Sequence, residues 1–193
     1  MSEVVMQSPL AGLAGTGPRM LAADGRSCEL AETSFAGMLN LRGSADDTAF
    51  AAAVLGATGL GLPLRSNSAA INVNGQLLWL GPDEWLLKLR ESSAAAMEAA
   101  LRTALPAQHV SVVDVSSGNT TLVLRGPAAA DVLARGCPLD LHPRGFAAGA
   151  LAQTHIAKAS VVILRPQAAP CYEITVRRSF ADYLFRWLCE AGR

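Results

Sequence analysis

The sequence predicts an α+β fold in which one order of elements, β-β-α-β-β-β-α, occurs twice. Short alternating stretches separated by Gly, Pro and Asn are typical of antiparallel strands. Each half ends in a stretch whose apolar residues share one helical face. The halves also match at residues 39–43 and 122–126, which read LNLRG and LVLRG. We therefore expect an internal duplication with halves of about 21–106 and 107–193, and helices on the outer faces of the sheets.

An N-terminal arm precedes the repeated pattern. Pro9, Pro18 and several glycines disfavour a helix or a central strand in residues 1–20. We expect this segment to be extended and to lie across a partner through Pro9, Leu10 and Leu13. A frayed terminus is the alternative.

The first half is expected to contain five strands and two helices. Ser44 has the spacing of a capping residue and is expected to begin the first helix, and Ser93 the second. The dipeptide Asn74-Gly75 favours a type I′ hairpin. The strands are expected at residues 27–32, 37–42, 69–73, 76–80 and 85–89.

The second half repeats this order. Pro127 suits the first position of a short helix. Ser179 is expected to begin the last helix. Its apolar stripe, typical of a core, consists of Phe180, Tyr183, Leu184, Trp187 and Leu188. The strands are expected at residues 110–115, 120–125, 151–156, 160–164 and 172–176.

The composition favours a protein that contacts a partner. Of the 193 residues, 51% are hydrophobic and 17% charged, whereas charged residues make up roughly 25% of a typical soluble domain. Such a surface suits an interface, although a compact Ala-rich domain is the simpler alternative. Lys plus Arg and Asp plus Glu each number 16, so no basic excess indicates nucleic-acid binding.

The compartment follows from the N-terminus and the cysteines. Residues 1–7 contain no basic residue, which does not fit a secretory signal, and the longest apolar stretch, 49–62, is too short to span a bilayer. We expect a cytoplasmic protein with no membrane or nucleic-acid partner. Its cysteines, at positions 28, 137, 171 and 189, are then expected to be free thiols.

Residues with catalytic potential are scattered. The sequence has no GxGxxG, no P-loop and no Cys/His spacing suited to zinc. His109, His142 and His155 are far apart and are interpreted as ordinary surface or core residues. We therefore expect no catalytic, cofactor-binding or metal-binding residue in this chain.

The run at residues 79–85, WLGPDEW, is interpreted as a tight turn in which Trp79 and Trp85 pack and Pro82 occupies the second position. The two acidic residues of the turn are adjacent, and adjacent residues of a strand face opposite sides, so they are poorly placed as an acid–base pair. The functional alternative is a turn that docks into a partner through Trp79, Pro82 and Trp85.

Longer motifs carry a family resemblance. Residues 113–116 (VDVS) and 122–129 (LVLRGPAA) resemble the opening signature of the folate-binding aminomethyltransferases, which include the T-proteins of glycine cleavage. Residues 38–43 (MLNLRG) and 78–87 (LWLGPDEWLL) are more similar to the gamma subunits of heterotetrameric sarcosine oxidases. The resemblance covers nearly the whole chain, and residues 78–87 are its most specific part.

The resemblance implies a folate-binding aminomethyltransferase-like domain built from two ferredoxin-like halves. It also implies a complex of alpha, beta, gamma and delta subunits that demethylates sarcosine to glycine. With tetrahydrofolate the complex yields methylene-tetrahydrofolate, and oxygen becomes hydrogen peroxide. FAD, FMN, NAD, tetrahydrofolate and a metal, zinc, are expected in the other subunits and none in this chain, which packs mainly on alpha.

The chain departs from the T-protein pattern in one hairpin. T-proteins use an aspartate there for folate transfer, whereas residues 155–161 of this chain read HIAKASV, without a carboxylate. Asp114 and Ser116 match the family signature and are interpreted as a local turn. We therefore expect a non-catalytic subunit that supports assembly. The alternatives are a free folate-binding one-carbon module, or an accessory subunit of a sister oxidase for another N-methyl amino acid.

Overall fold

The computed structural model describes residues 7–13, 17–33, 36–90, 93–105, 109–167 and 169–193. The larger sheet contains β1 (Arg19–Ala23), β2 (Arg26–Thr33), β8 (Asn119–Arg125), β9 (Leu151–Ile156), β10 (Ala159–Leu164) and β11 (Cys171–Arg177). The smaller sheet contains β3 (Met38–Arg42), β4 (Ala69–Ile71), β5 (Gly75–Gly81), β6 (Glu84–Leu89) and β7 (Ser111–Asp114). The helices are α1 (Thr48–Thr58), α2 (Ala94–Ala104), α3 (Ala129–Ala134) and α4 (Ala181–Ala191), and the 3₁₀ turns are η1 (Ser116–Gly118) and η2 (Arg178–Phe180).

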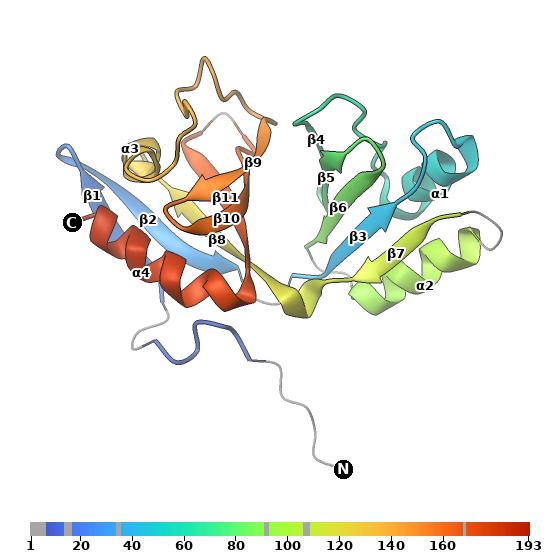
Figure 1. Cartoon of the computed structure of the whole chain (residues 1–193), viewed down its shortest axis with the longest axis horizontal. Helices are drawn as coiled ribbons and strands as arrows, with labels where there is room; N and C mark the ends of the chain where they lie inside the picture. The colour runs from blue at the N-terminus through green and yellow to red at the C-terminus, as the bar shows by residue number, and fades with distance from the viewer. Residues whose placement is uncertain (1–6, 14–16, 34–35, 91–92, 106–108, 168) are drawn as a thin grey trace, which may run out of the picture. The chain divides into compact units, whose positions relative to one another are not determined.

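The described residues thus form a mixed α+β protein with two sheets, as the sequence predicts (Figure 1). The strand order is β1-β2-β8-β11-β10-β9 in one sheet and β4-β5-β6-β3-β7 in the other. Helices α1 and α2 pack on each other, and α2 lies against β3 and β7. Helix α3 contacts α4, β1 and β2.

The sheets do not follow the two halves of the chain. β2 pairs with β8 rather than with β3, and β7 pairs with β3 rather than with β8. One compact unit therefore comprises Met1–Phe35, Ser117–Ala147 and Thr154–Arg193, and the other Ala36–Ser116 and Ala148–Gln153. The order β7-β3-β6-β5-β4 of one unit corresponds strand for strand to β2-β8-β11-β10-β9 of the other. The first half of the sequence thus contributes β1 and β2 to the larger sheet, and the second half contributes β7 to the smaller sheet.

The core of the smaller-sheet unit is built around Trp85. Its side chain is fully buried, and its ring centroid lies 5.7 Å from that of Phe50 on α1. The indole Nε1–H donates a 3.0 Å hydrogen bond to the carbonyl oxygen of Pro63. Because the polar atom of the indole has a partner, the whole side chain can be buried without leaving an unsatisfied donor.

Helix α1 begins later than the sequence analysis expects. Its N-cap is Asp47, whose carboxylate accepts hydrogen bonds from the N–H groups of Ala49 and Phe50 at 2.9 and 3.2 Å. Ser44 instead accepts a hydrogen bond from the N–H of Asp46. Serine and aspartate are both common N-cap residues. Which of the two caps the helix depends on where the first N–H groups without a helical partner lie.

The hairpin between β4 and β5 forms, but its turn is not of type I′. That turn requires positive φ at both central residues, and none of Val73, Asn74 and Gly75 has it. Instead, Asn72 Oδ1 accepts hydrogen bonds from the N–H groups of Asn74 and Gly75 at 2.8 and 3.0 Å. Gly75 is needed for close approach: a Cβ there would lie 2.4 Å from the carbonyl oxygen of Lys88 on β6.

In the larger-sheet unit, the end of the chain is fastened to the first strand. The N–H of Ala22 donates a 2.8 Å hydrogen bond to the carbonyl oxygen of Gly192. A Cβ at Gly192 would lie 2.5 Å from that of Leu21, so α4 and β1 approach closely there. Elsewhere in this core, the buried Tyr172 stacks on Phe146 at 6.4 Å.

Helix α4 buries only part of the stripe expected for it, Leu184 and Leu188. Its buried positions are Ala181, Leu184, Phe185 and Leu188, an i, i+3, i+4, i+7 series. Phe180 and Tyr183 lie outside this stripe and are 42% and 36% exposed. The prediction that these two aromatic residues belong to the core is wrong, because the helix is rotated by one position relative to the aromatic stripe.

Replacing Gly75 with Ala is expected to lower the free energy of unfolding by about 1–3 kcal/mol, because the Lys88 carbonyl belongs to the β5–β6 ladder and cannot move away cheaply. Gly56→Ala is the matched control. Gly56 lies within α1 with open space around it, so the change should raise the free energy of unfolding by roughly 0.5–1 kcal/mol. Chemical denaturation followed by circular dichroism measures both, and equal stabilities of the two variants would refute the close approach at Gly75.

Candidate partner-contact site

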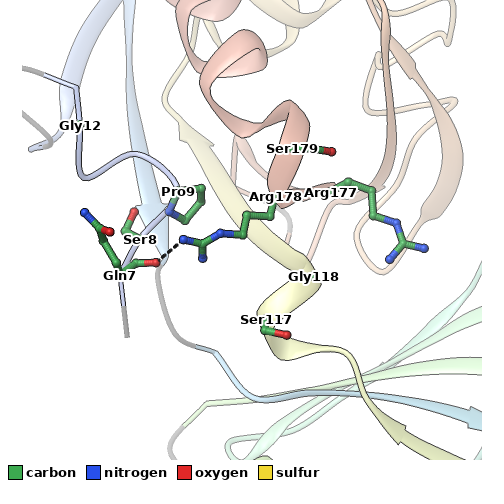
Figure 2. Close-up of a pocket in the computed structure, with 9 residues that line it drawn as sticks. All are labelled: Gln7, Ser8, Pro9, Gly12, Ser117, Gly118, Arg177, Arg178 and Ser179. Atoms are coloured by element: carbon green, nitrogen blue, oxygen red, sulfur yellow. Dashed lines mark hydrogen bonds between the residues drawn. The ribbon is translucent and has the colours of Figure 1, made fainter. Parts of the chain in front are cut away.

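A hollow of about 590 Å³ lies in the larger-sheet unit (Figure 2). Three chain segments line it. The first is the N-terminal segment through Gln7, Ser8, Pro9 and Gly12, the second is Ser117–Gly118 of η1, and the third is Arg177, Arg178 and Ser179 at the end of β11. The hollow therefore joins part of the expected N-terminal arm to two turns of the folded unit.

The N-terminal wall of the hollow is folded rather than extended. Residues 8–13 form successive turns, with the N–H of Ala11 donating to the carbonyl of Ser8 at 3.1 Å and that of Leu13 to Leu10 at 2.9 Å. The Leu10 side chain is only 2% exposed. Apolar burial thus helps to hold this part of the arm on its own chain.

Polar contacts fasten the same segment. Arg178 Nη2 donates a 2.7 Å hydrogen bond to the main-chain carbonyl of Gln7, the dashed line in Figure 2. The Ser8 hydroxyl donates to the carboxylate of Glu32 on β2, and Thr120 of β8 donates to the other oxygen of that carboxylate at 2.6 Å. Glu32 therefore connects the N-terminal segment to two adjacent strands.

The lining of the hollow is cationic. Arg177 and Arg178 are exposed, and no Asp, Glu, His or Cys occurs among the described residues that line it. Serine hydroxyls and main-chain groups supply the remaining polar atoms. Such a surface has hydrogen-bond donors for an anion. It has no general base, and therefore no base that could activate a nucleophile, so it is suited to binding.

An exposed aromatic pair follows the third lining segment in the sequence. Phe180 directly follows Ser179, and its ring meets that of Tyr183 edge to face, with centroids 6.3 Å apart. The Tyr183 hydroxyl also accepts a 3.4 Å hydrogen bond from the N–H of Lys158. Sequence reasoning missed this pair as surface residues, because an aromatic stripe at helical spacing usually indicates a core.

The structure divides the expected partner contacts between the two units. Pro9 lines the hollow, Leu13 is half-buried, and Leu10 is buried beneath the segment. Trp79 and Pro82 belong to the other unit, where Trp79 is half-buried and Pro82 exposed.

Two of the expected contacts are not accessible. Trp85 is 0% exposed and Leu10 only 2%, so neither presents a side chain to a partner in this structure. Trp85 instead packs in the core, which agrees with the packing alternative for its turn. The burial of Trp85 fits the packing interpretation given first for this turn, and a tryptophan next to a turn suits a core anchor as well as an interface anchor.

The turn that contains Pro82 is a two-residue connection between β5 and β6, with Gly81 paired to Glu84. The Glu84 carboxylate accepts hydrogen bonds of 2.8 Å from Asn40 Nδ2 and from Arg42 Nη2. The bond from Asn40 has the largest effect and lowers the pKa of Glu84 below its ordinary value. Burial opposes it, and the hydrogen bond and charge of Arg42 lower the pKa further. Glu84 is therefore an ionised structural residue, not a proton donor.

Asp114 and Ser116 form a local turn. Asp114 Oδ1 accepts hydrogen bonds from the N–H and the hydroxyl of Ser116, at 2.9 and 2.5 Å. The Ser116 hydroxyl oxygen in turn accepts a 2.9 Å bond from the N–H of Met38. Asp114 thus binds local backbone, the role expected from the sequence, whereas the Ser116 hydroxyl binds backbone at Met38, which is distant in the sequence.

The remaining candidate chemistry is dispersed. Cys28, Cys137, Cys171 and Cys189 are all free. Within the described ranges, no group of three or more His, Cys, Asp or Glu residues is placed to hold a metal ion. No helix among those residues is long and apolar enough to cross a membrane.

The hairpin that differs from the T-protein pattern is the β9–β10 turn at Ala157-Lys158, where Ala157 adopts a φ of 51°. Neither turn residue carries a carboxylate. These residues do not fit the folate chemistry that the T-protein resemblance implies, and we derive no folate step through this hairpin.

Comparison with known proteins now places the chain. The family model described as "Sarcosine oxidase, gamma subunit family" matches residues 42–193. The sarcosine oxidase subunit gamma of Corynebacterium sp. (strain U-96) is 37% identical over 191 residues, covering 98% of this chain and 91% of that protein. The chain belongs to the sarcosine oxidase gamma subunit family. The gamma subunit of Corynebacterium sp. (strain P-1) is also 37% identical, over 164 residues that cover 84% of this chain and 79% of that protein.

Solved structures agree with this family assignment. A chain of the heterotetrameric sarcosine oxidase from Corynebacterium sp. U-96, solved in complex with pyrrole 2-carboxylate, is similar with a TM-score of 0.87 and 36% identity, covering 97% of this chain and 94% of that chain. Aminomethyltransferase T of the Bartonella henselae glycine cleavage system matches with a TM-score of 0.65 and 17% identity, over 93% of this chain and 56% of that chain. This second likeness concerns the fold alone.

Replacing Leu10 with Ala is expected to loosen the N-terminal wall of the hollow. The lost burial should favour local opening by about 2 kcal/mol, which corresponds to amide exchange roughly 30-fold faster in residues 8–13. Leu13→Ala is the control, because Leu13 is only half-buried and its loss should have a smaller effect. Hydrogen exchange read by mass spectrometry tests both variants, and unchanged exchange in Leu10→Ala would contradict the anchoring role.

Replacing Asn40 with Ala is expected to raise the pKa of Glu84 toward its ordinary 4.5. A lowered pKa in the folded state contributes stability that is present above the ordinary value and is lost as pH falls through the folded value. Wild type should therefore be more stable than the variant above about pH 5, and the part of this difference due to Glu84 should vanish in acid. An NMR titration of the Glu84 carboxyl measures the shift, with a smaller rise expected for Arg42→Ala. The same pKa in Asn40→Ala and wild type would rule out this account.

Proposed function

We propose that this chain is a non-catalytic gamma subunit of a heterotetrameric sarcosine oxidase and that it supports assembly of the complex, mainly through contact with the alpha subunit. The observation that carries the proposal is similarity along the whole chain, at 37% identity over 98% of its length, to the Corynebacterium gamma subunit. The matching solved structure is described as heterotetrameric, so partner subunits alpha, beta and delta are part of the proposal.

The reaction of the proposed complex is the oxidative demethylation of sarcosine to glycine, with methylene-tetrahydrofolate and hydrogen peroxide as further products. FAD, FMN, NAD, tetrahydrofolate and zinc belong to the other subunits in this proposal. The present chain is inactive alone. In support, the lining of its hollow contains no acid, base or nucleophilic thiol among the described residues.

The fold belongs to the same proposal. We infer that the chain arose by duplication of a ferredoxin-like β-β-α-β-β-β-α half. The identical order of corresponding strands in the two sheets supports this origin. A duplicated domain that lost its catalytic residues would keep a stable fold. Its surfaces could then bind other subunits, which suits a subunit that supports assembly.

The geometry favours binding to protein. One unit contains the N-terminal segment, two exposed arginines and an exposed aromatic pair. A hydrogen bond joins the N-terminal segment to Arg178, and the aromatic pair follows in the sequence. Arg and aromatic residues are enriched at protein interfaces. We place the assembly contact on this unit and the complex in the cytoplasm. The turn through Trp79 and Pro82 is a second proposed contact.

Co-expression tests the function directly. A tagged form of this chain, produced with the genes of the three other subunits, is expected to recover a yellow, sarcosine-oxidising complex, whereas the isolated chain should be colourless and inactive. A lone chain that binds tetrahydrofolate and recruits nothing would indicate a free folate-binding module. A complex that oxidises another N-methyl amino acid, but not sarcosine, would indicate a sister oxidase.

Deletion of residues 1–17 is expected to reduce recovery of the complex about tenfold or more, since it removes Leu10 and the Gln7 carbonyl while leaving β1 intact. Recovery is measured by quantitative pull-down. Alanine replacement of Ser66, an exposed residue of the other unit, is the control and should leave recovery unchanged. Full recovery after the deletion would show that the N-terminal segment is not needed for assembly.

A further inference from the structure

We draw no further inference here: the strongest candidate, the cavity of about 480 Å³ in the larger-sheet unit that α3, β11 and residues 139–143 help to line, carries nothing, because its buried Arg165 and Tyr172 donate hydrogen bonds to main-chain carbonyls of this chain and its Asp131 pairs with an arginine of this chain, so nothing in the structure selects a ligand for it.

Discussion

The pairing of β2 with β8 is the constraint on which the larger-sheet unit depends. β8 is an interior strand whose other neighbour is β11, and its Leu122 and Leu124 are fully buried. Without β2, one side of its backbone would lose its hydrogen-bond partners inside the protein. Residues near the start of the chain therefore complete a sheet made by its second half. Since such pairing is non-local, the unit cannot form until most of the chain is present.

The hollow inherits its geometry from this pairing. Ser117 and Gly118 lead into β8, Arg177 ends β11 opposite Asn119, and the N-terminal segment runs toward β1. Glu32 of β2 accepts hydrogen bonds from both the N-terminal segment and β8. Three segments distant in sequence are thus fixed by one set of strands.

Sequence patterns indicated most strands, the last helix and the family, because alternation, turn residues and motifs are local signals. No local sequence signal predicts that β2 pairs with β8 and β7 with β3. The alternation of buried residues in β2 and β7 would be satisfied by pairing with either strand. The Asn74-Gly75 turn type depended on a side chain two residues earlier, Asn72. The exposure of Phe180 and Tyr183 depended on a rotation of one helical position. The site was hidden for the same reason: its residues become neighbours only through the tertiary fold.

Arg178 gives the hollow a thermodynamic property beyond shape. Its guanidinium both fastens the Gln7 carbonyl and lines the surface, so the ordering of residues 7–13 and the occupancy of the hollow share one group. Any molecule that contacts this guanidinium with different affinity when the segment is closed or open must shift the population of the closed form. By reciprocity, closing the segment changes the affinity for that molecule by the same factor. Amide protection in residues 7–13 would then report the binding of such a molecule to Arg178.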